Sequence, residues 1–137
     1  MISGFATPEG TKNFTAKNDS IPEKNFNTFQ DLSLSNVGIG TYLGNPDSDT
    51  DNMVKNAVKK SVLAGVNVID TAINYRAQKA ERSVGQAISE LINEDKISRD
   101  EIFISTKNGY VTNDGDIQED LMQYVMRELG KPGIVKE

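Results

Sequence analysis

Hydrophobic residues recur along this 137-residue chain with two different spacings. Short apolar runs rich in β-formers, within residues 37–44, 66–69 and 101–107, predict three buried strands. Between them, apolar residues at helical spacing predict one helix from the acidic cap at residues 49–51 to Gly65, and a second over residues 80–92. Strands that alternate with amphipathic helices are typical of a parallel sheet with right-handed crossovers.

The two predicted helices differ in how clearly one face is apolar. In the first helix, the small apolar residues at helical spacing are Val54, Ala57, Val58 and Val62. In the second helix, the apolar positions form one face of a 3.6-residue repeat, and they are Ala80, Val84, Ala87, Ile88, Leu91 and Ile92. The opposite, polar face of this helix is expected to carry Lys79, Arg82, Gln86 and Glu90.

The N-terminal part of the chain has a weaker pattern. Residues 1–25 are polar, with scattered glycine, proline and asparagine, and they predict an irregular arm. Residues 26–34 alternate in short pieces around Gln30-Asp31, which predicts a small hairpin. The expected division is therefore an arm at 1–25 and one α/β domain at 26–137.

Beyond residue 110 the periodicity weakens again. The polar cluster at residues 113–116 predicts a turn, and residues 117–129 predict a helix stopped by Gly130. The chain then ends in residues 133–137 without a further strong pattern. We therefore interpret residues 110–137 as an insertion or a substitute helix.

The composition of the chain limits which partners and which catalytic groups are available. A net charge of −5 without a Lys/Arg cluster argues against nucleic acid or an anionic membrane as a partner. No cysteine is present, which excludes disulfides and thiolate chemistry and fits a cytoplasmic location. No histidine is present either, so the commonest general base and metal ligand is missing. Catalysis must therefore use tyrosine, lysine, aspartate or glutamate, and no metal site is expected.

Polar groups that could carry chemistry follow two of the predicted strands. Asp70 ends the second strand, Tyr75 lies on the loop after it, and Lys107 ends the third strand. Sites in parallel α/β proteins are built at such strand ends. Each residue alone also has an ordinary structural interpretation, since Asp70 can turn the chain, Lys107 can be solvated and Tyr75 can pack.

Taken together, these three side chains form a proton-donating group. A phenol has an ordinary pKa of about 10, too high for efficient proton donation near neutral pH. An ammonium group close to a phenol favours the phenolate and lowers that pKa, and a carboxylate orients the ammonium. Such a group can protonate a carbonyl oxygen while hydride from a cofactor reaches the carbon.

Several motifs resemble the aldo-keto reductase family from about Asn27 to Lys107. They are Val37-Gly38-Ile39-Gly40-Thr41, Asn67-Val68-Ile69-Asp70-Thr71-Ala72-Ile73-Asn74-Tyr75, Ala80-Glu81-Arg82-Ser83-Val84-Gly85 and Ile104-Ser105-Thr106-Lys107. The family is a (β/α)8 TIM barrel with an N-terminal hairpin, and it reduces aldehydes and ketones with NADPH or NADH. The resemblance implies the α/β class as an incomplete barrel, namely the hairpin and roughly the first three βα units.

The resemblance also implies roles for individual residues. Tyr75 would be the general acid, Lys107 the partner that lowers its pKa, and Asp70 the partner of Lys107. The nicotinamide end of the cofactor would lie beside Gly40, Thr41, Tyr42 and Asp70. The family's catalytic histidine has no counterpart, because this sequence contains no histidine.

Two other functions stay open at this stage. The first is a non-catalytic barrel fragment that self-associates or binds a partner through its unpaired strands, with Asp70, Tyr75 and Lys107 as inherited features. The second is a dinucleotide-binding Rossmann fold, suggested by Gly38, Gly40 and Gly44. The glycine spacing misses that fingerprint by one position, and no helix follows directly. We expect a small carbonyl compound as the substrate if the chain is an enzyme.

Overall fold

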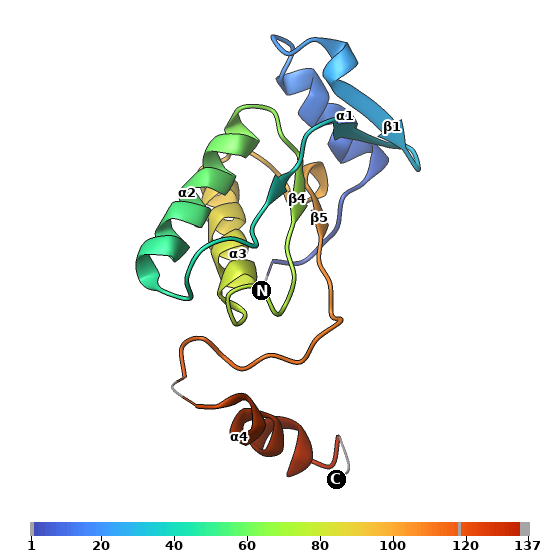
Figure 1. The fold of residues 1–137 in the computed structure, drawn as a ribbon. Coiled ribbons are helices and arrows are strands. Elements are labelled where there is room, and N and C mark those ends of the chain that lie inside the picture. The colour runs from blue at the N-terminus through green and yellow to red at the C-terminus, as the bar shows by residue number, and fades with distance from the viewer. Residues whose placement is uncertain (1, 118, 135–137) are drawn as a thin grey trace.

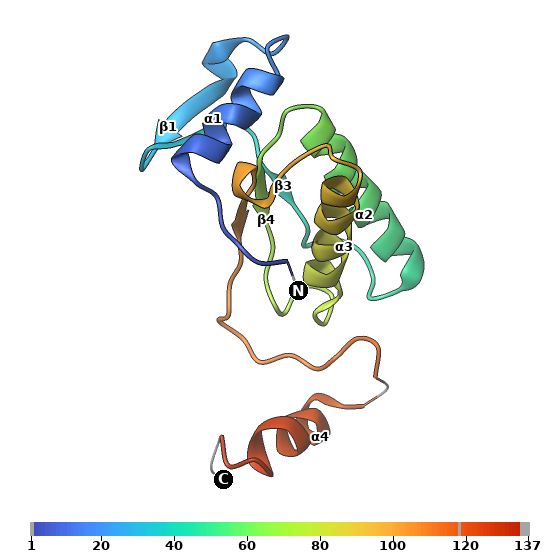
Figure 2. The same ribbon diagram turned by 180° about the vertical axis from the view of Figure 1, so that it is seen from behind.

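A three-stranded parallel sheet forms the centre of the molecule, whose computed structural model describes residues 2–117 and 119–134 (Figure 1). Its strands stand in the order β3 (Ile39–Gly40), β4 (Val68–Asp70) and β5 (Phe103–Ser105). Helices α2 (Ser48–Leu63) and α3 (Lys79–Asn93) follow the first two strands and lie side by side on one face of the sheet (Figures 1 and 2). The predicted mixed α/β class is confirmed, and the sheet is open.

The hydrophobic core lies between this sheet and the two helices. Ile69 is fully buried at the middle of β4, and in the strand register it pairs with Ile39 on one side and Ile104 on the other. These three side chains join one hydrophobic cluster with the apolar faces of the helices. The helix residues of that cluster are Val58 and Val62 of α2 and Val84, Ala87, Ile88 and Leu91 of α3, with Val54 and Ile92 partly buried beside them.

Two positions differ from the predicted helix faces. Ala57 is exposed, because α2 turns only a narrow stripe toward the sheet. Lys79 is buried rather than solvated, because its ammonium is paired with two carboxylates, Asp51 at 2.9 Å and Asp116 at 2.6 Å. A buried charge is stable only when it is paired in this way.

The predicted hairpin is confirmed as β1 (Phe26–Phe29) and β2 (Leu32–Ser35), which pair antiparallel. Its two central residues, Gln30 and Asp31, both have positive φ, as a two-residue hairpin turn requires. The hairpin is tied to the sheet by Asn67, which is fully buried just before β4. Its amide oxygen accepts from the backbone N–H of Ser35 at 2.8 Å, and its amide nitrogen donates to a carbonyl of the same strand.

The prediction of an irregular arm over residues 1–25 is wrong, because this segment contains helix α1 (Pro8–Lys17) and a 3₁₀ turn, η1 (Glu23–Asn25). Thr7 caps α1 by accepting from the N–H of Gly10, and Pro8 suits the first helical position. The helix packs on η2 (Arg99–Glu101) and on β2, so it is held by tertiary contacts rather than by an apolar stripe.

The segment after β5 forms α4 (Leu121–Val125), which continues as the π-helical η3 (Met126–Gly130). The predicted helix at 117–129 therefore begins later and extends one residue further, while its residue 118 lies outside the described part of the chain, as do residues 135–137. Helix α4 lies beyond the end of the sheet where the strands finish, and it does not cover the sheet (Figure 1). None of the helices within residues 2–117 and 119–134 combines the length and apolarity needed to cross a membrane.

Candidate active site

The structure brings Asp70, Tyr75 and Lys107 together at the carboxyl end of the parallel sheet. The Nζ atom of Lys107 lies 2.7 Å from Oδ1 and 2.8 Å from Oδ2 of Asp70. The same Nζ atom lies 3.2 Å from the hydroxyl oxygen of Tyr75 and donates to the carbonyl of Thr71 at 2.9 Å. The ammonium therefore connects the carboxylate to the phenol, as the sequence analysis expected of these three residues.

Backbone pairing explains why residues so far apart in sequence meet here. Asp70 is the last residue of β4 and pairs with Ser105 of β5, so Lys107 follows β5 at the same edge of the sheet. The ladder continues past the strands, because the N–H of Thr71 donates to Ser105 and the N–H of Ile73 donates to Lys107. The loop after β4 thus runs beside the end of β5, and it carries Tyr75 back toward the ammonium.

The hydrogen-bond pattern fixes the charge of Lys107 and leaves the phenol able to donate. Hydrogen bonding to Asp70, with a smaller contribution from Tyr75, raises the pKa of the Lys107 ammonium, so it stays protonated at neutral pH. Because Lys107 donates to the Tyr75 oxygen, the phenolic hydrogen is not used in that contact. In the described part of the chain it has no acceptor, and the arrangement can donate it to a bound oxygen.

The residues expected beside a nicotinamide lie at the same rim. Thr41 is buried, and both its N–H and its hydroxyl donate to the carbonyl of Asp70, at 3.1 and 3.0 Å. Tyr42 is 64% exposed, and its ring meets that of Tyr75 edge to face, with the centroids 5.0 Å apart. Gly40 pairs with Asp70 in the strand register, and within the described residues nothing lies within 4 Å of the place a Cβ would take.

This rim fits one end of a nicotinamide cofactor. An open backbone at Gly40 beside an exposed aromatic ring suits a flat, partly apolar group, and the neighbouring proton donor suits its chemistry. The cation at this rim, Lys107, is already paired with Asp70, so the residues named here offer no partner for phosphate groups. Gly40, Thr41 and Tyr42 could therefore hold the nicotinamide end and not the rest of the molecule.

The surface around the site is shallow. A depression of about 320 Å³ beside Lys107 is lined by Ile73, Glu81, Thr106 and Asn108 as well. A larger hollow of about 680 Å³ lies along α3 and β5, and neither Asp70, Tyr75 nor Lys107 lines it. The side chains of Lys107 and Asp70 are 46% and 45% exposed, so water reaches the pair.

Sequence reasoning missed two parts of this site. The carbonyl of Thr71 accepts from Lys107, and a backbone acceptor of this kind leaves no signal in the residue types. Arg76, directly after Tyr75, has a side chain that is only 1% exposed and is bonded to Asp51. The sequence indicated Arg76 in one way, because this arginine directly follows Tyr75, the candidate acid.

Comparison with known proteins identifies relatives of this chain. The Aldo/keto reductase family matches residues 36–131, which extends past Lys107, where the predicted resemblance ended. The aldo-keto reductase AKR2E4 of Bombyx mori is 33% identical over 99 residues, which make up 72% of this chain and 30% of that protein. The NADH-specific methylglyoxal reductase of Escherichia coli (strain K12) is 33% identical over 86 residues, or 59% of this chain and 24% of that protein. The chain therefore spans less than a third of the length of these curated relatives.

Proposed function

The chain belongs to the aldo/keto reductase family, and we propose that its site serves the reduction of an aldehyde or ketone to an alcohol with NADPH or NADH. One observation carries the proposal. The ammonium of Lys107 contacts both carboxylate oxygens of Asp70 and the hydroxyl of Tyr75 at 2.7 to 3.2 Å. The names of the two relatives, an aldo-keto reductase and an NADH-specific methylglyoxal reductase, support the same reaction class.

The proposed chemistry assigns one task to each side chain. Tyr75 donates its phenolic proton to the carbonyl oxygen of the substrate, and Lys107 stabilises the negative charge left on the tyrosine oxygen. Asp70 holds the ammonium in place through two hydrogen bonds. A bound nicotinamide would supply the hydride that the carbonyl carbon accepts, since no side chain can do so. The carbonyl thus gains a hydride at carbon and a proton at oxygen, which gives an alcohol.

We also propose that the sheet is part of a (β/α)8 barrel. Three parallel strands in sequential order, two helices on one face and a hairpin at the opposite end from the site support this fold. The third βα unit would then need a covering helix other than α4, which stands away from the sheet (Figure 2). Residues 110–134 fit an insertion in this scheme. The cytoplasm, expected for a chain without cysteine, is part of the same proposal.

The test is a cofactor titration followed by turnover. NADPH and NADH are titrated separately into the purified chain while nucleotide fluorescence is followed, and an aldehyde is then added while absorbance reports oxidation of the nucleotide. We expect saturable binding and aldehyde-dependent oxidation that falls at least about 100-fold in Tyr75→Phe, the lower end of what a general acid contributes. Tyr110→Phe is the matched control, because Tyr110 is 75% exposed and is not part of the site. Equal turnover in Tyr75→Phe and Tyr110→Phe would contradict the proposed role.

The open sheet favours a second candidate function, association with another polypeptide or a second copy. Within the described residues, β3 and β5 each pair with β4 only, so both edges of the sheet have unpaired backbone groups. Such edges template further strand pairing. Sedimentation measured over a range of concentrations tests this candidate: a monomer at all concentrations argues against self-association. Dimers in a chain that binds no nucleotide would favour the non-catalytic fragment over the enzyme.

A further inference from the structure

The turn that follows Tyr75 has an unusual backbone. Arg76, Ala77 and Gln78 have φ values of 49°, 52° and 73°, three consecutive residues in the left-handed region. None of them is glycine, and non-glycine residues adopt this region at an energetic cost. A run of this kind persists only where the surrounding structure holds it. A specific contact must therefore hold this turn in place next to Tyr75, the proposed proton donor.

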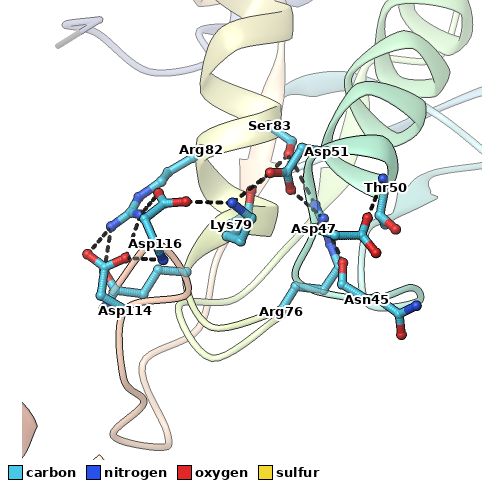
Figure 3. A network of polar contacts seen from close by, with 11 residues as sticks. Asn45, Asp47, Thr50, Asp51, Arg76, Lys79, Arg82, Ser83, Asp114 and Asp116 are labelled. Carbon is cyan, nitrogen blue, oxygen red and sulfur yellow. Dashed lines mark hydrogen bonds and ion pairs between the residues drawn. The ribbon is translucent and has the colours of Figure 1, made fainter. Parts of the chain in front are cut away.

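The side chain of Arg76 is buried and anchors the turn through the polar contacts drawn in Figure 3. Its guanidinium donates from Nη1 to Asp51 of α2 at 2.6 Å and from Nη2 to the hydroxyl of Ser83 of α3 at 3.1 Å. Nη1 also lies 3.5 Å from the carbonyl of Asn45. Nε is buried and has no partner within residues 2–117 and 119–134. Arg76 thus joins two helices and a loop through one planar group.

The Asn45 contact links Arg76 to a second part of the site. Asn45 lies on the loop between β3 and α2, and the same loop carries Tyr42. The ring of Tyr42 contacts that of Tyr75 edge to face, with the centroids 5.0 Å apart. The guanidinium therefore connects the turn that follows Tyr75 with the loop that carries Tyr42. The turn contains Arg76, and the loop contacts its guanidinium through Asn45.

We infer that Arg76 is a positioning residue, which holds the turn at 76–78 against α2, α3 and the Tyr42 loop and so sets the Tyr75 hydroxyl against Lys107. The importance of this position rests on the proposed function, in which Tyr75 is the proton donor. The geometric claim itself is independent of turnover. A guanidinium suits the task because its rigid fork reaches several acceptors at once.

The test reads the position of the Tyr75 ring directly by NMR. The chain, which has four tyrosines, is labelled at the tyrosine rings, and Tyr75→Phe assigns the Tyr75 signals. Two readouts follow: the cross-peak between the rings of Tyr42 and Tyr75, and the change in the Tyr75 signal caused by Lys107→Met. A misplacement of about 1 Å, which can cost an enzyme about 100-fold, would weaken an r⁻⁶ cross-peak across 5.0 Å about threefold.

We expect Arg76→Gln to weaken the cross-peak at least about threefold and to abolish the response of Tyr75 to Lys107→Met. Arg76→Lys, which keeps the charge beside Asp51, should restore part of both signals. Arg127→Gln is the matched control, because Arg127 is also an arginine paired with carboxylates, and its partners Glu119 and Glu128 lie outside the turn and the Tyr42 loop. It should leave both readouts at the wild-type level.

An Arg76→Gln variant that is folded and keeps both readouts overturns the inference. If Arg76→Gln does not fold, Ser83→Ala and Arg76→Lys decide the matter, and wild-type cross-peaks in both variants overturn it equally. Absence of carbonyl reduction by the wild-type chain would refute the proposed function and would leave these ring measurements unchanged. The two failures are therefore distinguishable.

Discussion

The carboxylate of Asp114 holds the segment after β5 against helix α3, and its removal should release that segment. Both of its oxygens accept from Arg82, at 2.7 Å each, and the neighbouring Asp116 is paired with Arg82 and Lys79 (Figure 3). Next to these pairs, the N–H of Gly115 donates to the carbonyl of Ala77 at 2.8 Å. Asp114→Asn removes the charge and keeps the size of the side chain, so it tests this contact alone.

The size of the effect follows from the proton affinity of Asp114. The hydrogen bonds from Arg82, then from the backbone of Asp116, lower its pKa from the ordinary 3.8 to about 2. For a pair shielded from solvent, a difference of this size corresponds to about 2 kcal/mol. Arg82 is 39% exposed, however, and solvent-exposed ion pairs are typically worth about 0.2–1 kcal/mol. We therefore expect about 1 kcal/mol, which corresponds to about a fivefold change in the open population of the segment.

The sign of the pH dependence follows from the direction of the shift. Because the pKa of Asp114 is lower in the docked segment than in the free one, its contribution is fully present above pH 3.8. The contribution is lost as the pH falls from there toward about 2. The difference between the wild-type chain and Asp114→Asn should disappear over the same range.

The assay is hydrogen exchange at the single amide of Gly115, measured by NMR at neutral pH. Protection of this amide should fall about fivefold in Asp114→Asn. Asp19→Asn, a change at an exposed aspartate near α1, should leave it unchanged. The amide signals of Gly115 and Asp116 should also titrate with a midpoint near 2 rather than 3.8. Equal protection of the Gly115 amide in Asp114→Asn and Asp19→Asn, or a midpoint at 3.8, would contradict this prediction.

Four further substitutions test the packing that supports the site. Gly65 has φ +90°, and a Cβ there would stand 2.0 Å from Cδ1 of Ile21, so Gly65→Ala should destabilise the chain by about 1–3 kcal/mol in denaturant unfolding. Its matched partner Gly85→Ala, in open space on α3, should stabilise by about 0.5–1 kcal/mol. Ile69→Ala should cost about 2–5 kcal/mol, since the side chain is fully buried at the centre of the sheet, and an unchanged melting temperature would contradict this. Asn67→Ala should cost about 1–3 kcal/mol and raise hydrogen exchange in β2, with no change in exchange there as the contrary result.

The placement of the candidate site could be predicted because it depends on strand direction alone. Parallel strands finish at one edge, so the residues that end β4 and follow β5 must come close together, whatever packs around them. Asp70 and Lys107 meet for this reason, and Tyr75 lies near because the loop after β4 is short. Periodicity also predicted α3 well, since its buried positions follow one face of the helix.

Other features depend on contacts that residue spacing does not encode. The buried residues of helix α1 are Gly10, Thr11 and Phe14. Because Phe14 is the one large apolar residue among them, the sequence shows no apolar stripe that would predict the helix. A Cβ at Gly10 would stand 2.4 Å from the carbonyl of Asp100, which shows how close that approach is. Lys79 was expected on a solvated face for a similar reason: its partners Asp51 and Asp116 are distant in sequence.

The exposure of the rim separates two requirements of the proposed reaction. Proton donation needs Asp70, Tyr75 and Lys107, and all three come from two adjacent strands and one loop, so this group forms without a closed barrel. The second requirement, exclusion of water from the site, is not met by these residues. The side chains of Asp70 and Lys107 are nearly half exposed, and an ion pair in water contributes little. Polypeptide that covered the open side of the sheet would exclude water and strengthen each of these electrostatic contacts. The geometry of the proton-donating group is therefore local to this chain, whereas its shielding from water depends on what covers the rim.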